Sequence, residues 1–333
     1  MFQLGSIVMP SQSSLSWENA KARAVIITKI RHFFACRSII EVETPLLSHG
    51  TTTDVHLESF SSHYNFLDDS SDSCSSLMYL QTSPEFAMKR LLASGYGCIY
   101  QICKAFRHEE YGRHHNPEFT MLEWYRVGFN HFDLMAEVSE LLIAILDCQP
   151  CIKISYQEVY IKHLNIDPLD TSLDELITLI KCRKKSSKWL EDETDIDILL
   201  QFIFSEMIEP HIGLEAPYLI YNFPSSQASL AKISTIDTRV AERFECYYQG
   251  IELVNGFNEL TDAKQQQLRF INDNDLRATK NLPLKPIDNN FIDALSEGLP
   301  DCAGVALGID RLVMLALNEK HINCVLSFSI ENA

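Results

Sequence analysis

The chain has 333 residues, of which 46% are hydrophobic and 10% aromatic, so it can bury one large core or two ordinary ones and is not a disordered protein. Its 28 Lys and Arg against 45 Asp and Glu give a net charge of −17, which argues against a broad electrostatic grip on a nucleic acid backbone. The chain has neither an apolar run of roughly twenty residues nor a basic and then apolar N-terminus, so we expect a cytoplasmic protein with no membrane segment.

The first predicted elements follow a tail of residues 1–14. Residues 17–36 place apolar side chains at helical spacing after Ser16, a suitable N-cap, so a helix is expected there. Residues 38–47 are rich in β-branched side chains and include a proline, which predicts a strand that ends at a sheet edge or an interface. This helix and strand belong either to the core or to a dimer contact. Residues 59–76 are rich in Ser and Asp and predict a mobile loop or a ragged hairpin.

A short strand and a helix follow this Ser-rich segment. Residues 77–81 predict the strand, and Thr82 leads into a helix over residues 86–93 with Pro84 near its first turn. Glu85 then lies at a helix N-terminus, where a carboxylate complements the helix dipole.

Two longer strands are predicted at residues 99–107 and 119–127. Apolar and polar positions mix there with β-branched and aromatic residues, and the two segments flank a charged turn at residues 109–116. The pattern therefore indicates a hairpin.

This hairpin carries side chains that suit a nucleotide and an ammonium group. Residues two apart on a strand share a face, so Arg107 is expected beside Glu109, and Glu123 beside Tyr125. A planar guanidinium suits phosphate oxygens, and the ring of Phe119 can stack on a purine. The alternative is an exposed hairpin laced with surface ion pairs, which contribute little.

The rest of the chain predicts helices around further strands, which indicates an α+β fold with antiparallel strand pairing. Helices are expected at residues 133–146 and 308–317, a helical insertion at about 164–212, and strands at 218–223, 241–248, 250–253 and 302–307.

Three carboxylates recur at intervals of seven residues, at Glu245, Glu252 and Glu259. Their aromatic and β-branched neighbours, with Gly250 and Gly256, favour strands and turns over one long helix. Carboxylates in a half-apolar segment need cations, such as Mg²⁺ bound together with substrate phosphates, or a substrate ammonium. The alternative is surface carboxylates on strand edges.

The stretch GVALGIDR at residues 304–311 places small residues on a strand and Arg311 on the first turn of a helix. Glycines allow a ligand to approach the backbone closely, and a helix start adds positive potential for a phosphate.

Together these segments resemble the catalytic core of the class II aminoacyl-tRNA synthetases, and the lysine subgroup in particular. Residues 107–119 are similar to the second class motif and residues 304–311 to the third. The helix and strand ending at Pro45 are similar to the first motif, which forms the dimer interface. The resemblance covers nearly the whole chain and implies a single antiparallel catalytic domain flanked by helices, with ATP and Mg²⁺ as ligands and a homodimer as the assembly.

The resemblance implies roles at ATP for the matching residues. Arg107 would hold the α-phosphate and His115 and Arg311 the outer phosphates, which makes the two arginines the catalytic pair. Phe119 and Arg311 would sandwich the adenine. The other implied ATP contacts are His108, to which we assign no separate role, Glu109, Asn116, Glu252, Leu253 and Gly308.

The resemblance also implies the Mg²⁺ ligands and the amino acid pocket. Glu245 and Glu252 match the metal ligands, and Glu85 and Glu109 would face the α-type amino group or its surroundings. A buried ammonium must be paired, and the pocket for the distal one matches acidic residues. That pocket comprises Glu123, Tyr125, Asn255 and Glu259, and Ser83, Pro84 and Ala306 complete the implied amino acid site.

The implied reaction is adenylation: the lysine carboxylate attacks the α-phosphorus of ATP in line, pyrophosphate leaves, and a nucleophile then attacks the acyl-adenylate. Lysyl-tRNA synthetases carry an N-terminal anticodon-binding domain, whereas this chain enters the catalytic core near residue 15, and its acidic charge adds to the case against tRNA. We therefore expect the truncated branch of the group, which joins lysine or (R)-β-lysine to a lysine side chain of elongation factor P. A stand-alone enzyme that acylates tRNA or a small amine, and an inactive regulatory paralogue, are the alternatives.

Two stretches depart from the synthetase pattern. Residues 222–231 read NFPSSQASLA where a proline-containing SPLA is usual, and Ala306 stands where lysyl-tRNA synthetases typically have glycine. One added methyl reshapes the space near the amino acid backbone, so we hypothesise that Ala306 favours β-lysine over α-lysine. The alternative is that this alanine merely packs the strand.

Overall fold

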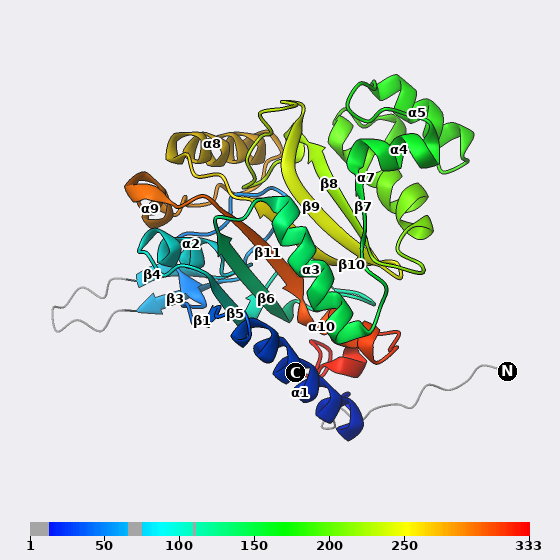
Figure 1. Cartoon of the computed structure of the whole chain (residues 1–333). Coiled ribbons are helices and arrows are strands. Elements are labelled where there is room, and N and C mark those ends of the chain that lie inside the picture. The colour runs from blue at the N-terminus through cyan, green and yellow to red at the C-terminus, as the bar shows by residue number, and fades with distance from the viewer. Residues whose placement is uncertain (1–12, 66–74, 109–110) are drawn as a thin grey trace. The chain divides into compact units, whose positions relative to one another are not determined.

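The computed structural model describes residues 13–65, 75–108 and 111–333 (Figure 1). The chain divides into two compact units. Unit 1 comprises Met1–Gly128, Thr261–Asp301 and Ala306–Ala333, and unit 2 comprises Phe129–Leu260 and Cys302–Val305.

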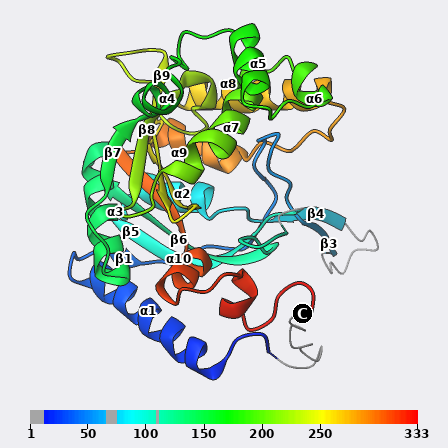
Figure 2. The same ribbon diagram turned by 90° about the vertical axis from the view of Figure 1, so that its right-hand side faces the viewer.

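Unit 1 is built on a hairpin of two long strands. β5 (Ile99–Phe106) pairs antiparallel with β6 (Glu118–Val127), and β1 (Ile40–Glu41) runs parallel to β5. A second sheet has the order β2-β4-β3, in which β3 and β4 lie side by side (Figure 2). The remaining elements of unit 1 are α1 (Trp17–Ala35), β2 (Leu47–Ser48), β3 (Ser61–Asn65), β4 (Ser75–Leu80), α2 (Glu85–Ala93), α8 (Ala263–Thr279), α9 (Asn289–Gly298), α10 (Ile309–Ala316) and the 3₁₀ helix η4 (Ile322–Val325).

Unit 2 contains a sheet of order β10-β9-β8-β7, antiparallel except for the parallel pair β7 and β8. Helix α3 packs against β9 and β10 (Figure 1). Its elements are α3 (His131–Leu146), β7 (Ile152–Ser155), α4 (Tyr156–Leu164), α5 (Leu173–Cys182), α6 (Lys188–Glu191), α7 (Ile196–Ile203), the π-helix η1 (Phe204–Ile208), the 3₁₀ helices η2 (Glu209–His211) and η3 (Ser225–Gln227), β8 (Tyr218–Pro224), β9 (Val240–Tyr248) and β10 (Ile251–Asn258). Strand β11 (Cys302–Gly308) begins in unit 2 and ends in unit 1.

Aromatic side chains form the centre of the core of unit 1. Phe34 of α1 stacks on Tyr100 of β5, with ring centroids 4.4 Å apart, and meets Trp124 of β6 edge-on at 5.4 Å. Burial of each such side chain contributes roughly 1.5–3 kcal/mol. Helix α1 is thereby fixed to the strands whose other residues form the candidate site.

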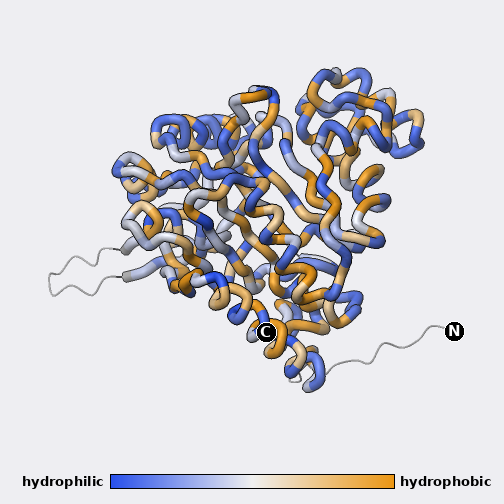
Figure 3. Tube along the Cα trace, viewed as in Figure 1, coloured by the Kyte–Doolittle hydropathy of each residue, from blue (hydrophilic) through white to orange (hydrophobic). Residues whose placement is uncertain are grey.

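The core of unit 2 lies between its sheet and the helices of residues 156–212. Tyr156, Phe204 and Phe223 belong to one buried apolar cluster there. Hydrophobic and hydrophilic residues alternate at short intervals along the trace of each unit, as half-buried helices and strands require (Figure 3). In the described part of the chain, no helix has both the length and the apolarity needed to span a membrane.

The predicted α+β class is confirmed, as are most of the predicted elements. The helix at residues 17–36 forms with the predicted cap, because the Ser16 hydroxyl accepts a hydrogen bond from the Asn19 amide at 3.1 Å. Residues 164–212 are largely helical, as expected, although their status as an insertion stays a prediction. The Ser-rich segment forms β3 and the start of β4 at its ends, and residues 66–74 between them lie outside the described part.

Two sequence predictions are wrong, and two helices were missed. The strand expected over residues 38–47 is mostly irregular: only Ile40–Glu41 and Leu47–Ser48 form strands, and Pro45, which has no amide hydrogen to donate, lies in the irregular stretch between them. Gly256 lies inside β10, which continues to residue 258 rather than ending at 253. Helices α8 and α9 were not predicted.

Gly256 is required where it stands because β10 passes close to an aromatic ring. Its partner across the strand pair is Phe244, and a Cβ built on Gly256 would lie 2.4 Å from the Phe244 Cζ atom. We expect Gly256→Ala to lower the free energy of unfolding by roughly 1–3 kcal/mol, since the buried ring has to move. Thermal and urea unfolding measure this, with Gly112→Ala as the control because nothing lies within 4 Å of its added methyl. Equal stability of the two variants would contradict the prediction.

Candidate active site

One group of predicted site residues lies at the turn of the β5–β6 hairpin in unit 1. Arg107 follows the end of β5, and its backbone amide donates to the Pro117 carbonyl at 2.9 Å. Its guanidinium carbon lies 5.2 Å from the centroid of the Phe119 ring, within the range of a cation–π contact. The structure therefore brings together the residues predicted for the α-phosphate and the adenine.

The first turn of α10 meets the same turn of the hairpin. The Nη2 atom of Arg311 lies 2.6 Å from Nε2 of His115, and its Nε atom donates to the His114 carbonyl at 3.2 Å. Because a guanidinium only donates, Nε2 of His115 is the acceptor. Burial, together with the neighbouring cations Arg113 and Arg311, lowers the pKa of His114. The two residues predicted for the outer phosphates are thus adjacent.

Asp310 fixes the helix that carries Arg311. One of its carboxylate oxygens accepts from the Thr120 backbone amide at 2.7 Å, and the other lies 2.7 Å from Nη2 of Arg23 on α1. Asp310 is buried, so this pairing ties α10 to β6 with little competition from water. No role was predicted for Asp310, although its position next to Arg311 in the sequence could have indicated one.

The other residues predicted around the turn differ in their surroundings. The side-chain amide of Asn116 donates to the Glu118 carbonyl at 2.6 Å, and its oxygen accepts from the Ile330 amide at 3.0 Å, so it braces the turn. The His108 backbone amide donates to the Glu58 carbonyl, and its side chain is exposed. Glu109 lies outside the described residues, so its predicted proximity to Arg107 stays a prediction.

A second group lies on the same hairpin, nearer its open end. Both oxygens of Glu123 accept hydrogen bonds, one from the Ser83 hydroxyl and one from the Tyr125 hydroxyl, each at 2.6 Å. Ser83 also accepts from the Glu85 backbone amide at 3.1 Å, while Pro84 forms the N-cap position of α2. The predicted pairing of Glu123 with Tyr125 is confirmed.

Glu123 is a buried carboxylate with a strongly shifted proton affinity. Burial, and then the negative charge of Glu85, raise the pKa of Glu123 to about 7, and the hydrogen bonds from Ser83 and Tyr125 only partly oppose them. Burial and the Glu123 charge likewise raise the pKa of Cys103 to about 12, so its thiol stays protonated near neutral pH. A cation bound at this end of the hairpin would therefore stabilise the ionised form of Glu123.

The carboxylates of unit 2 lie on one face of the β9–β10 pair. Glu245 accepts hydrogen bonds from Arg243 and from the Tyr247 hydroxyl, both on its own strand. Across the strand pair, Asn255 is opposite Glu245, and Glu252 is opposite Tyr247. Burial alone would lower the pKa of Arg243, but the nearby charges of Glu245 and Glu252 raise it. Arg243 is thus the protein's own counter-ion for two predicted metal ligands.

These carboxylates suit Mg²⁺ only with help from a substrate. In the described part of the chain, no group of three or more His, Cys, Asp or Glu side chains is arranged to hold a metal. Mg²⁺, however, often takes one or two carboxylates, with phosphate oxygens and water filling the other positions. Two carboxylates on one face fit that mode, although Arg243 and Tyr247 engage both oxygens of Glu245 and Arg243 would have to move before Glu245 could bind a metal.

The remaining predicted residues of unit 2 are buried to different degrees. The Glu259 side chain is 1% exposed, and its backbone amide donates to the Cys302 carbonyl at 3.0 Å. Leu253 is buried in β10, and Asn255 is half-buried. Unit 2 thus contributes a buried acidic residue and a polar strand face.

The sequence of the chain matches a known protein family over nearly its whole length. The sequence profile of the family described as "tRNA synthetases class II (D, K and N)" matches residues 8–332. The chain belongs to this family of class II synthetases. Its relatives include proteins named "Elongation factor P--(R)-beta-lysine ligase" from Salmonella paratyphi A, Salmonella typhi and Salmonella choleraesuis. Each is 53% identical over 322 residues, which cover 97% of this chain and 98% of the relative.

Membership of the class II synthetases confirms the fold that the sequence predicts, a largely antiparallel sheet with flanking helices. Within this class II synthetase, the strand-to-helix turn at Gly308 and Arg311 also forms as expected, with Ala306 half-buried near the end of β11. Gly308 precedes α10 directly, and a Cβ added there would lie 3.6 Å from the Arg311 Cδ, an ordinary van der Waals contact.

Two cations near the predicted carboxylates were missed from the sequence, Lys89 and Arg243. Lys89 lies one helical turn after Glu85, and its Nζ is 2.6 Å from a Glu85 oxygen. Arg243 precedes Glu245 by two residues on a strand, so both face the same side. In each case the spacing to a singled-out carboxylate is the signal that was available.

Proposed function

We propose that this protein is an ATP-dependent amino acid–protein ligase. It activates (R)-β-lysine or lysine as the adenylate and transfers it to a lysine side chain of elongation factor P. The observation that carries the proposal is the 53% identity, over almost the full length of both chains, to proteins named as ligases of elongation factor P and (R)-β-lysine.

ATP use follows from membership of the class II synthetases. We assign the α-phosphate to Arg107 and the outer phosphates to His115 and Arg311, whose contact at 2.6 Å supports a shared role. In-line attack by a carboxylate needs little acid–base chemistry. It needs two anions held together and the developing charge stabilised, and fixed guanidinium groups supply that.

Mg²⁺ would be held by Glu252, and by Glu245 once Arg243 yields, together with phosphate oxygens. When bound, the ion neutralises charge on the phosphates and the leaving pyrophosphate. Arg243 keeps these carboxylates paired when no cation from solution is present, because unpaired buried charges are costly.

The amino acid would be recognised mainly through its ammonium groups. As the family resemblance implies, we assign Glu85, Glu123, Tyr125, Asn255 and Glu259 to this recognition. Support comes from the buried Glu123, whose raised pKa marks a site that a cation stabilises. A neutral amino acid cannot repay the cost of burying these carboxylates.

Amino acid-dependent exchange between ATP and labelled pyrophosphate tests the activation step. We expect exchange with (R)-β-lysine or lysine and none with norleucine, which lacks the distal ammonium. Exchange that is absent with every amino acid would instead support the inactive paralogue.

Ala306 provides a test of which lysine isomer is preferred. Removing its methyl in Ala306→Gly should raise the ratio of α-lysine to β-lysine adenylation roughly tenfold, because one methyl-sized change in a pocket contributes about 1–3 kcal/mol. The matched control is Ala303→Gly on the same strand, at a position three residues away and therefore on the opposite face. If the ratio in Ala306→Gly equals that of the unaltered protein, the alanine merely packs the strand.

We also propose a homodimer formed through residues 15–48. Large apolar side chains of this segment are exposed in the single chain, and Arg31 is locked to Glu41 by hydrogen bonds of 3.0–3.2 Å, which stiffens the surface. The exposed apolar residues are Trp17, Val25, Ile40, Leu46 and Leu47. Sedimentation should show a dimer that Ile40→Asp dissociates and that Leu284→Asp, an exposed apolar position outside the segment, leaves intact.

A further inference from the structure

A lysine lies fully buried beside the carboxylates assigned to the amino acid. The side chain of Lys89 on α2 has 0% exposure, and its Nζ is 2.6 Å from a Glu85 oxygen, one helical turn away. Phe291 of α9 lies beneath it, with the ring centroid 5.8 Å from Nζ. An ammonium in such a place costs several kcal/mol unless it is paired. An i,i+4 ion pair on a helix surface leaves its lysine exposed, so the complete burial of Lys89 sets this pair apart.

Lys89 belongs to a continuous chain of contacts that ends at the hairpin. Lys89 binds the Glu85 carboxylate, and the Glu85 amide donates to the Ser83 hydroxyl. Ser83 donates in turn to Glu123, whose other oxygen accepts from Tyr125. Every member of this chain lies in unit 1, and together they fix where the two carboxylates lie.

The charges of Lys89, Glu85 and Glu123 do not sum to zero. Two carboxylates and one ammonium leave one net negative charge when Glu123 is ionised. Without Lys89 the set would carry two negative charges in a mostly buried place, and like charges there favour the uptake of a proton. A set that is one charge short of neutrality is completed by one ammonium of a ligand.

We propose that Lys89 is a positioning residue for the amino acid substrate. Its ammonium holds Glu85 in place and offsets one of the two carboxylates, so that Glu85 and Glu123 together accept one of the two substrate ammonium groups rather than a second cation or a proton. This inference rests on the proposed function. Lys89 itself touches no reacting atom.

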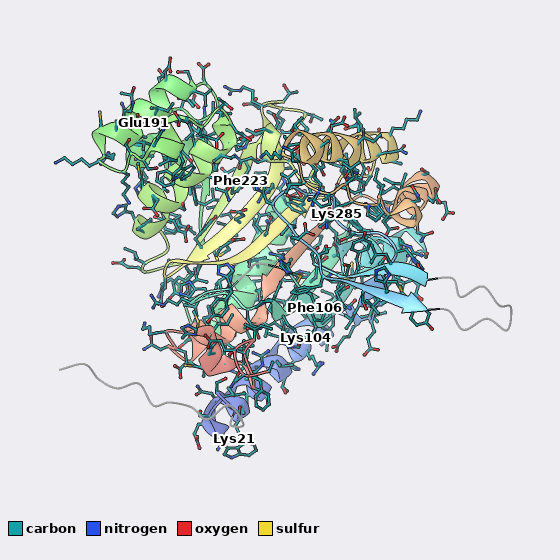
Figure 4. The ribbon with its side chains drawn as sticks, turned by 180° about the vertical axis from the view of Figure 1, so that it is seen from behind. Lys21, Lys104, Phe106, Glu191, Phe223 and Lys285 are labelled. Atoms are coloured by element: carbon teal, nitrogen blue, oxygen red, sulfur yellow. The ribbon has the colours of Figure 1, made fainter. Side chains whose placement is uncertain are left out.

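The pH dependence of substrate binding reports this role. The positive charge of Lys89 lowers the pKa of Glu123, whereas burial and Glu85 raise it. The KM for (R)-β-lysine should fall as Glu123 ionises, and Lys89→Met should raise the midpoint of this fall by about one pH unit. At pH 7 this raises the KM about fivefold, and well below pH 7 about tenfold. Amino acid-dependent pyrophosphate exchange measures it, and the KM for ATP should not change. Lys104→Met on β5 is the matched control, because that lysine is part-exposed and pairs with Glu118 (Figure 4).

A second variant tests the inference if Lys89→Met fails to fold. The double substitution Glu85→Gln with Lys89→Met removes both charges and leaves no buried unpaired ion. The larger influence of Glu85 on Glu123 is then lost as well, so the midpoint should shift to lower pH. A wild-type midpoint in the folded variants would overturn the inference alone. Absence of exchange in the unaltered protein would overturn the proposed function and this inference with it.

Discussion

Arg311→Ala is expected to lower the kcat of amino acid-dependent pyrophosphate exchange by roughly 10²–10³-fold, the usual effect of removing one fixed donor to a developing charge. Arg311 lies on the first turn of α10, and its guanidinium contacts His115 and the His114 carbonyl. Its backbone is held independently, because Asp310 binds Arg23 and the Thr120 amide. The variant should therefore fold normally and lose only the phosphate contact.

Two further variants make this result specific. Arg311→Lys should restore little activity, since an ammonium cannot reproduce the planar fork of a guanidinium. Arg239→Ala should leave exchange unchanged, because Arg239 is exposed and pairs only with Asp237 two residues away among the contacts described for its side chain. Wild-type exchange in Arg311→Ala would remove this arginine from the ATP site.

Glu123→Gln is expected to have a comparable effect on the amino acid. The substitution keeps the shape but leaves a substrate ammonium without a buried partner, a change that costs about 3–5 kcal/mol, or a hundredfold or more in kcat/KM. The kcat/KM for the amino acid should fall, and the KM for ATP should stay the same. Glu118→Gln, at an exposed position on the same strand, is the control.

The pH profile distinguishes a lost charge from lost packing. Because the pKa of Glu123 is about 7, binding of an ammonium should strengthen as pH rises through neutrality in the unaltered protein, and the Gln variant should lose this dependence. The stability of the ligand-free protein should change in the opposite sense. A carboxyl with a raised folded-state pKa contributes its full stability below its ordinary pKa and loses it as pH rises through about 7. The melting temperature of Glu123→Gln should therefore exceed that of the unaltered protein at about pH 8 but not at about pH 5.

The hairpin of β5 and β6 was predictable from sequence because the alternation of residues that defines its strands also determines which side chains share a face. Alternating residues defined the strands, and the period of two placed Glu123 beside Tyr125, as the hydrogen bond between them confirms. The aromatic and β-branched neighbours of Glu245, Glu252 and Glu259 likewise indicated strands rather than a helix, and Glu245 and Glu252 do lie on strands. Which of these side chains share one substrate stays a prediction.

Other features were not accessible from the local pattern. Helix α8, with the sequence AKQQQLRFINDNDLRAT, is polar on most sides, so its apolar stripe is weak and its tertiary contacts decide its structure. Residues 42–46, which include Pro45, are irregular although their β-branched neighbours favoured a strand. The spacing of Lys89 to Glu85 is visible in the sequence, but the complete burial of Lys89 is not, because it depends on tertiary packing.

Acceptor choice is the central claim, and one competition experiment tests it most directly. The protein would be incubated with ATP, Mg²⁺ and labelled (R)-β-lysine in the presence of both elongation factor P and tRNA, and the label in each acceptor would be counted. We predict label on elongation factor P, lost when its acceptor lysine is replaced by arginine, and none on tRNA. Label on tRNA alone would contradict the account.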